Sequence, residues 1–292
     1  MAKSSGVNKE EMAANYGWAL SFLKSNNELW KLFNKSVDKN YSVNRFVASL
    51  RNTKWFKKHG EAYRQSQVLQ KTDPGTYKQR MTLLQSKVHD MAGAMGSQLS
   101  SSQANHIASN AMWFGWDDSM IRNNLANFVK QVGTTGHYGG EAGQAEDELR
   151  QYAYNMGVKV SDSGLKGWLT NIVAQNQSVA TYKAYIQSQA EHAFPTLSDK
   201  IKQGVTVKDL ADPYIQQMSQ TLEMDHSSIG LDDPTIRKAL QTTDNKGQFQ
   251  AQPMWAFEKQ LKEDPRWMKT DNARSALVGT AQGVHKDWGL HF

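Results

Sequence analysis

The chain contains 292 residues, no cysteine and a net charge of +6. The absence of cysteine excludes a disulfide framework, a thiolate zinc site and a cysteine nucleophile. Its apolar content of 39% is ordinary for a folded protein, but its mean hydropathy of −0.67 is polar for that class. This mixture favours a helix-rich or elongated body with much surface. Because no apolar run approaches the roughly 18 residues of a membrane-spanning helix, we expect a soluble protein with no stable membrane span, made in the cytoplasm.

The positive charge is concentrated in the N-terminal third of the chain. Residues 1–90 contain 16 Lys and Arg against 7 Asp and Glu, which gives +9, whereas the remainder sums to −3. A basic segment of this kind is typical of contacts with nucleic acid, anionic lipid or acidic protein. The alternative is that these cations only keep the surface soluble, and the sequence leaves both interpretations open.

In chain order, the apolar residues recur at the spacing of amphipathic helices. They share one face within residues 16–23, 29–37, 43–50 and 77–95, and again within 107–114 and 121–128. The stripe over 77–95 is the longest, with spacings of 4, 3, 4, 3 and 4. No alternating run of Val, Ile or Thr is long enough to indicate a sheet. We therefore predict an all-α protein of repeated amphipathic helix pairs packed as helical bundles.

Four of the six prolines follow an aspartate, and this pair favours the start of a helix. An Asp at the N-cap accepts a hydrogen bond from a free backbone N–H. A Pro at the first helical position loses nothing by lacking an N–H. We expect a helix to begin at each of Asp73-Pro74, Asp212-Pro213, Asp233-Pro234 and Asp264-Pro265.

One glycine-rich segment interrupts the helical pattern. Five glycines lie from Gly133 to Gly143, and glycine is a poor helix former. We interpret residues 132–145 as a loop or hinge. It would divide the chain into an N-terminal basic helical domain (1–131) and a C-terminal helical domain (146–292).

Two segments resemble each other in the spacing of their apolar residues. One opens at Leu29 and the other at Leu165, and an aromatic residue follows each opening leucine after 17 positions. These aromatic residues are Phe46 and Tyr182. The unit would be two helices joined by a polar turn, and stacked copies of such a pair share a core. The alternative is chance similarity among amphipathic helices.

The repeat extends upstream and into a third, looser copy. Tyr16 and Tyr152 each lie 13 positions before the opening leucine of their copy. The third copy opens at Ile236, and Phe257 follows it after 21 positions. Each copy ends in an aromatic residue that we interpret as a structural anchor: Trp55, Phe194 and Trp267.

The stretch RNTKWFKKHG (51–60) is the strongest candidate for a basic surface patch, formed by Arg51, Lys54, Lys57 and Lys58. Its cations and aromatic rings would suit phosphate contacts and base stacking, so a nucleic-acid-binding module is one alternative. Its counterpart KEDPRWMKTD keeps the tryptophan but adds acidic residues. A packing role for the tryptophan tolerates this change more readily than a phosphate-binding role does.

No catalytic motif occurs in the sequence. A phosphate-binding loop, a zinc-protease motif and a nucleophile elbow are all missing, and the eight histidines never fall at metal-ligand spacing. We therefore predict a non-enzymatic protein with no catalytic residue, no cofactor and no metal site. The alternative is a peptidoglycan-cleaving enzyme similar to lytic transglycosylases, with Glu141 as its general acid. No second carboxylate is identifiably placed for that chemistry.

Three stretches of the chain resemble virion structural proteins of tailed bacteriophages, especially of phages that infect actinobacteria. They are YGWALSFLKSNNELWKLFNKSV followed by RFVASLRNTKWFKKH, LADPYIQQMSQTLEM followed by DDPTIRKALQ, and PMWAFEKQLKEDPRWMKTDNAR, and the similarity runs from about residue 14 to 288. Such relatives are identified as minor tail, tape-measure-associated or internal virion proteins. The motifs carry no defined chemistry, so the resemblance assigns no functional residue.

The resemblance implies a structural component of a phage particle, located in the tail or on the DNA-ejection path. Its partners would be other virion proteins of the tail or connector and further copies of itself. The basic N-terminal third would then lie near phage DNA or an acidic tail partner. The virion is the expected location, and assembly or genome delivery is the expected role.

Overall fold

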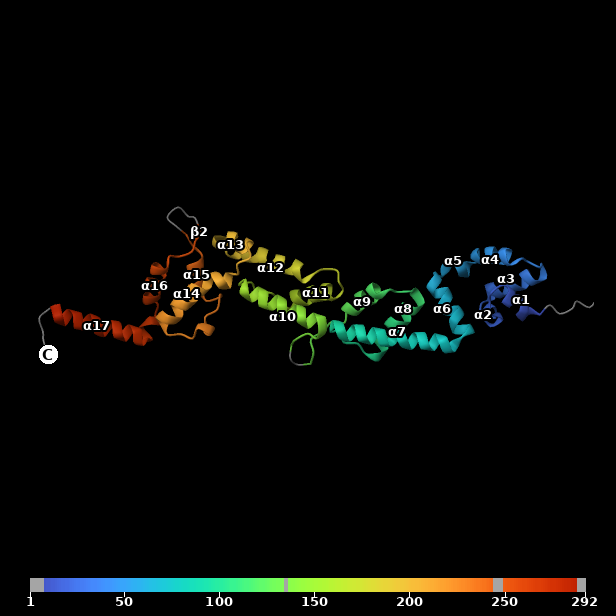
Figure 1. Cartoon of the computed structure of the whole chain (residues 1–292), viewed down its shortest axis with the longest axis horizontal. Helices are drawn as coiled ribbons and strands as arrows, with labels where there is room; N and C mark the ends of the chain where they lie inside the picture. The colour runs from blue at the N-terminus through green and yellow to red at the C-terminus, as the bar shows by residue number, and fades with distance from the viewer. Residues whose placement is uncertain (1–7, 134–135, 244–248, 288–292) are drawn as a thin grey trace, which may run out of the picture. The chain divides into compact units, whose positions relative to one another are not determined.

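The protein is described by a computed structural model over residues 8–133, 136–243 and 249–287 (Figure 1). Most of these residues lie in α-helices, which confirms the prediction of an all-α fold. The chain divides into two compact units. The first is Met1–Gly143 with Val173–Asn176, and the second is Gln144–Ile172 with Gln177–Phe292.

The first unit is built from consecutive helices. Among its described residues these are α1 (Lys9–Asn15), α2 (Leu20–Lys24), α3 (Asn27–Asp38), α4 (Val43–Arg51), α5 (Lys54–Lys58), α6 (Glu61–Thr72), α7 (Pro74–Met95), α8 (Ser101–Phe114) and α9 (Asp118–Ala126). Helix α10 (Gly140–Asn155) contains the division between the units.

Among its described residues, the second unit continues with α-helices, three short 3₁₀ helices and one pair of short strands. They are α11 (Asp162–Val173), α12 (Val179–Ala193), η1 (Pro195–Leu197), α13 (Ser198–Lys202), α14 (Val207–Leu222), η2 (His226–Ser228), α15 (Pro234–Leu240), β1 (Thr242–Thr243), β2 (Phe249–Gln250), α16 (Met254–Glu263), η3 (Trp267–Lys269) and α17 (Asp271–Asp287). The two strands pair antiparallel, Thr242 with Gln250 and Thr243 with Phe249, and they are too short to form a substantial sheet.

Side-chain caps explain where many of these helices begin. Asn26, Ser42 and Thr53 precede α3, α4 and α5, and each side chain accepts hydrogen bonds from backbone N–H groups of the first turn. Ser100 and Gln103 form a reciprocal capping box at the start of α8. Each cap satisfies donors that have no partner inside the helix and stabilises it by about 1 kcal/mol.

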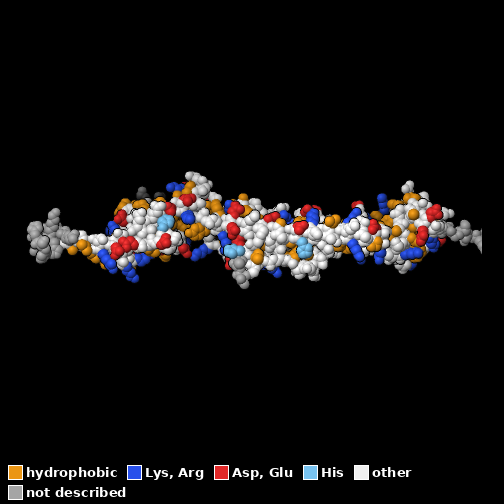
Figure 2. Space-filling view, turned by 60° about the horizontal axis from the view of Figure 1, so that its bottom comes forward, with side chains coloured by type: hydrophobic (Ala, Val, Ile, Leu, Met, Phe, Trp, Pro, Cys, Tyr) orange, Lys and Arg blue, Asp and Glu red, His pale blue; other side chains and the backbone are white. Residues whose placement is uncertain are grey.

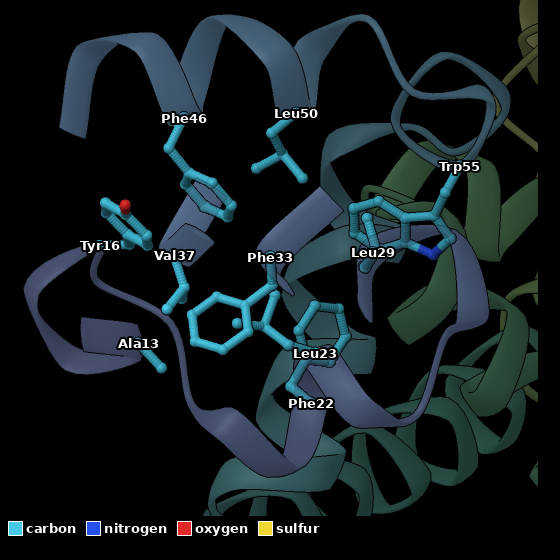
Figure 3. Close-up of a cluster of buried hydrophobic side chains, with 10 residues drawn as sticks. All are labelled: Ala13, Tyr16, Phe22, Leu23, Leu29, Phe33, Val37, Phe46, Leu50 and Trp55. Atoms are coloured by element: carbon cyan, nitrogen blue, oxygen red, sulfur yellow. The ribbon is translucent and has the colours of Figure 1, made fainter. Parts of the chain in front are cut away.

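A cluster of ten buried side chains forms the core of helices α1 to α5 (Figure 3). Figure 3 shows these side chains pointing into one shared space: Ala13, Tyr16, Phe22, Leu23, Leu29, Phe33, Val37, Phe46, Leu50 and Trp55. Neither helix of a single pair is long enough to cover all of these groups. Residues from several short helices therefore complete one hydrophobic cluster.

A tyrosine from outside the helix pair closes this core. Tyr16, at the end of α1, stacks on Phe46 with ring centroids 4.4 Å apart, and its edge meets Phe33. Its hydroxyl donates a 2.9 Å hydrogen bond to the backbone carbonyl of Tyr41. That carbonyl lies two residues before α4 begins. We call this arrangement the tyrosine latch, because it fixes both the turn and the second helix.

The third copy of the repeat contains the same latch. Tyr214 of α14 packs edge-on against Phe257 with centroids 5.3 Å apart. Its hydroxyl donates to the carbonyl of Gln252 at 2.6 Å, and Gln252 also lies two residues before its helix, α16. Phe257 is the fourth residue of α16, as Phe46 is of α4. Residues 244–248 of this copy lie outside the described residues.

The middle copy lacks the latch. Tyr152 carries the ammonium of Lys183 over its ring, 5.3 Å from the centroid, and among the described residues its ring does not pack on that of Tyr182. Tyr182 instead stacks on Trp168 of α11 and remains partly exposed. The sequence spacing thus correctly aligns Tyr182 with Phe46 and Phe257 on the second helix of each copy. Tyr182 is nevertheless partly exposed, whereas the two phenylalanines are buried.

Two of the four expected helix starts are wrong. Asp73-Pro74 and Asp233-Pro234 begin α7 and α15 as predicted. Pro213, however, lies inside α14, because Thr206 caps that helix earlier by accepting the N–H of Asp209. Asp264 follows α16, and its carboxylate accepts the N–H of Arg266 within a turn that leads to η3.

The glycine-rich segment is shorter as a loop than the sequence predicts, because α10 begins at Gly140 and not after residue 145. Residues 134 and 135 of the segment lie outside the described residues. A Cβ atom at Gly140 would come within 2.3 Å of the carbonyl oxygen of Ala94, and one at Gly143 within 2.5 Å of that of Tyr138. These glycines therefore permit close backbone packing in the first turn of a helix.

Within the described part of the chain, no helix combines the length and the apolar character needed to cross a bilayer.

We predict that both tyrosine latches stabilise their helix pairs through the hydroxyl as well as the ring. Tyr16→Phe and Tyr214→Phe should each lower stability by about 1 kcal/mol, because each leaves a part-buried carbonyl without its donor. Hydrogen exchange measured by mass spectrometry should show faster exchange in α4 for the first variant and in α16 for the second. Tyr154→Phe is the control, since the exposed Tyr154 hydroxyl has no hydrogen bond to the described residues.

Candidate functional site

The predicted basic patch is exposed, but its aromatic rings are not available for stacking. Arg51, Lys54, Lys57 and Lys58 all face solvent and form no ion pair within the described residues. Trp55 is only 4% exposed. The patch therefore offers cations for phosphate contacts but no exposed ring on which bases could stack.

The rings of this stretch are held by the protein itself. The indole N–H of Trp55 donates to Gln67 at 3.0 Å, and its ring meets that of Phe22 edge-on. The guanidinium of Arg64 covers Phe56, 3.8 Å from the ring centroid. Both aromatic side chains thus contribute to packing.

Glu28 connects the start of α3 to the start of α5. Its two carboxylate oxygens accept the backbone N–H groups of Lys54 and Trp55 at 2.8 and 2.9 Å. These hydrogen bonds hold the pKa of Glu28 below its ordinary value. The contact positions the backbone that carries Trp55 and uses no side-chain atom of Lys54.

The three predicted anchors occupy different environments. Trp55 and Phe194 are buried in the cores of their own units, whereas Trp267, in η3, is only half-buried. Beside Trp267, the guanidinium of Arg266 donates to the carboxylate of Asp264 at 3.0 and 2.8 Å, and to the hydroxyl of Thr235 at 3.0 Å. Thr235 immediately precedes Ile236, the opening residue of the third copy, just as Glu28 immediately precedes Leu29 in the first. In the first and third copies, a hydrogen bond therefore connects the start of the opening helix to the segment that carries the closing tryptophan.

The alternative catalytic residue, Glu141, is engaged in an ion pair. Arg122 donates to both of its carboxylate oxygens at 2.7 and 3.2 Å, and also to the carbonyl of Val173 at 2.9 Å. All three residues belong to the first unit. Among the residues that the structure describes, no group of three or more His, Asp or Glu side chains is placed to hold a metal ion.

An open groove in the second unit was not predicted from the sequence. It has a volume of about 620 Å³ and lies along α11, α12 and the segment that precedes α11. We call it the aromatic groove, after Trp168, Tyr182 and Tyr185, which contribute its rings. Trp168 stacks on Tyr182 with centroids 4.9 Å apart, and Tyr185 meets Trp168 edge-on at 5.6 Å.

The remaining side chains of the aromatic groove are mainly neutral. Polar contributions come from Ser161, Asn171, Gln177, Thr181 and Gln189. Asn171 donates a 3.1 Å hydrogen bond to the hydroxyl of Tyr182. Lys159 is the one charged residue among those lining this groove, and its ammonium lies 3.6 Å from the carboxylate of Asp232.

A second cavity of about 510 Å³ adjoins the aromatic groove and shares Val158, Lys159 and Gln189 with it. The two together form a longer depression that Tyr154 and Arg237 continue. The signal that could have located this site in the sequence is the spacing of its rings. Trp168, Tyr182 and Tyr185 occur where the other two repeat copies place core residues or polar residues.

Apolar side chains are also exposed near the end of the chain. Trp255 of α16 and Met268 of η3 are 73% and 65% exposed, and both α16 and α17 pack against η3. In α17, Leu277 and Val278 are 61% and 56% exposed, while Ala273 is buried. Figure 2 shows apolar side chains at the surface along the stretch that ends at the grey C-terminal residues. We refer to Trp255, Met268, Leu277 and Val278 as the C-terminal apolar residues.

Comparisons of the chain with protein-family models, with curated proteins and with solved structures found no match. The basic patch, the aromatic groove and the C-terminal apolar residues are therefore the features from which its function can be inferred.

We predict that Trp55 contributes far more to stability than the cations around it. Trp55→Ala should destabilise the first unit by about 3–5 kcal/mol, as expected for a buried tryptophan. Trp267→Ala should cost the second unit less, about 1–2 kcal/mol, because that ring is half-buried. Lys57→Ala and Lys58→Ala, as surface controls, should stay within about 0.5 kcal/mol of the wild type. Urea unfolding with peptide-resolved hydrogen exchange measures each effect, and unchanged protection of α4 in Trp55→Ala would contradict the prediction.

Proposed function

We propose that this protein is a non-enzymatic structural component of a tailed-phage particle that acts through helix packing. The resemblance of three long stretches to virion proteins supports the assignment to a particle. The observation that carries the structural role is the exposure of the C-terminal apolar residues, two of which, Leu277 and Val278, are neighbours on α17, since large apolar groups at a surface favour protein association. The tail or the DNA-ejection path is the proposed location.

Helix α17 is the element best suited to make such contacts. In its described side chains only Ala273, in the first turn, is buried, and the residues from Arg274 to Ala281 are exposed. The start of the helix is fixed, because Glu223 accepts the backbone N–H groups of Asp271 and Asn272 at 2.9 and 2.8 Å. A helix that is anchored at one end and apolar along one side gains stability by packing against another helix. We assign this partner to a second copy of the chain.

The environment of Glu141 supports the non-enzymatic part of the proposal. A general acid must present a carboxyl oxygen to the leaving group of its substrate. Both oxygens of Glu141 are hydrogen-bonded to Arg122, which is itself held by the carbonyl of Val173. This geometry favours a structural ion pair between α9 and the residues that follow it.

The basic patch favours a second, compatible activity, which is contact with an acidic partner such as phage DNA. Four exposed cations without ion pairs in the described chain carry this proposal. Because both rings are packed, binding would rest on phosphate contacts alone and would not depend on sequence.

We predict that association requires the apolar side of α17. In the wild type, light scattering coupled to size exclusion should give a mass above the 32.9 kDa of one chain. Leu277→Asp should reduce it to that of a monomer, because an aspartate in a helix interface would be buried without a partner. Ser275→Asp is the matched control, since two residues along a helix turn the side chain by about 200° to the opposite face. A wild-type chain that is monomeric at high concentration would exclude self-association.

The particle assignment has its own test. Mass spectrometry of purified phage particles that encode this chain should detect it at a fixed copy number. Its absence from particles, with normal abundance in infected cells, would overturn the assignment and would favour an assembly chaperone.

We also predict that any DNA binding is electrostatic. With a 20-base-pair duplex as the probe, the logarithm of the binding constant should fall with the logarithm of salt concentration with a slope of about −3 to −4 for four phosphate contacts. Lys57→Glu with Lys58→Glu should abolish binding, whereas the same change at two exposed lysines of α13, Lys200 and Lys202, should have little effect. Equal loss in both double variants would assign binding to net charge and not to the patch.

A further inference from the structure

The aromatic groove differs from the equivalent region of the other two repeat copies in being open. In those copies a tyrosine latch covers the aromatic residue of the second helix, so that Phe46 and Phe257 are fully buried. In the middle copy the equivalent Tyr182 is covered on one side by Trp168, and Tyr185 beside it is 53% exposed. Three rings thus line an open groove, and one of them, Tyr182, is equivalent to a ring that the other two copies bury in a core.

The chemistry of the groove is that of rings combined with neutral hydrogen-bonding groups. Amide side chains of Asn, Gln and hydroxyls of Ser, Thr each offer both a donor and an acceptor. Five such residues line the groove, and the one cation, Lys159, already faces Asp232. A well-matched ligand is therefore uncharged and carries many groups that both donate and accept hydrogen bonds.

From this arrangement we infer that the aromatic groove binds a neutral oligosaccharide. Sugar hydroxyls both donate and accept, as the lining amides and hydroxyls do. The C–H groups on the flat side of a sugar ring suit an electron-rich ring face, and the half-exposed Tyr185 is the ring best placed to offer one. The volume of about 620 Å³ lies in the range of small-ligand sites, and the adjoining cavity of about 510 Å³ extends it for a chain of sugars.

Two other ligand classes fit the groove less well. A single-stranded nucleic acid would use the rings, but it also requires cations along its backbone. The groove offers only Lys159, and the adjoining cavity adds one further cation, Arg237, together with the carboxylate of Asp232. A proline-rich peptide would use the rings too, but its prolines have no N–H, so the acceptor oxygens of Asn171, Gln177 and Gln189 would lack donors. The inference goes beyond the proposed structural role and does not depend on it.

Calorimetric titration of the full chain tests this inference with three probes: chitohexaose, cellohexaose and maltohexaose. At least one should bind with one-to-one stoichiometry. Tyr185→Ala should weaken its affinity roughly threefold to tenfold, through loss of one aromatic contact. Because Tyr185 is half-exposed, this variant should fold as the wild type does. Gln189→Ala, at the junction of the two cavities, should also weaken binding.

Trp255→Ala is the matched control, since Trp255 is 73% exposed and lines neither cavity. Its affinity for the sugar should equal that of the wild type, and so should that of Leu277→Asp. The inference is overturned if none of the three sugars binds, or if Tyr185→Ala leaves the affinity unchanged. Binding of decaproline or of a 15-nucleotide oligodeoxythymidine that Tyr185→Ala abolishes would also overturn it, in favour of a peptide or nucleic-acid site.

Discussion

A short helix pair cannot cover the aromatic ring at the start of its own second helix, and the structure depends on how that ring is covered. In the first and third repeat copies a tyrosine from a preceding helix packs on the ring and donates its hydroxyl to the turn. The ring contact removes apolar surface from water, and the hydrogen bond fixes where the second helix begins. One side chain thus joins three elements that are separate in sequence. Where it is missing, in the middle copy, the aromatic groove opens.

Much of the fold follows from local patterns in the sequence, and its exceptions have local causes. Helical spacing predicts the all-α class and the apolar stripe of α7. The six residues of this stripe are all buried or partly buried: Tyr77, Met81, Leu84, Val88, Met91 and Met95. The Asp-Pro rule fails at Pro213 because an upstream threonine caps α14 first. The glycine rule fails at Gly140, where close backbone packing and not chain flexibility requires the missing side chain. Both failures concern contacts that composition and spacing do not encode.

The candidate sites were less accessible to sequence reasoning than the fold. The basic patch is readable as a run of cations, but only the structure shows that Trp55 is buried and that Arg64 covers the partly buried Phe56. The aromatic groove is the reverse case. Tyr182 occupies a position that the repeat marks as core, whereas Tyr185 aligns with polar residues of the other two copies. The groove is open because no tyrosine covers Tyr182 in the folded chain. The spacing of the rings marks the residues of the groove, but the long-range contact that is missing around them leaves no signal in a local pattern.

The hydrogen bonds that Glu28 accepts make the position of Trp55 independent of the surface charge of the 51–60 stretch. The carboxylate holds the backbone of residues 54 and 55, so the tryptophan is positioned whichever side chain precedes it. The side chains of Lys57 and Lys58 are consequently not needed to position the tryptophan. Variation can raise, lower or invert the charge of this surface while the core beneath it stays intact. The same scaffold is thereby open to partners of different charge, and binding preference can evolve at this position without a loss of folding stability.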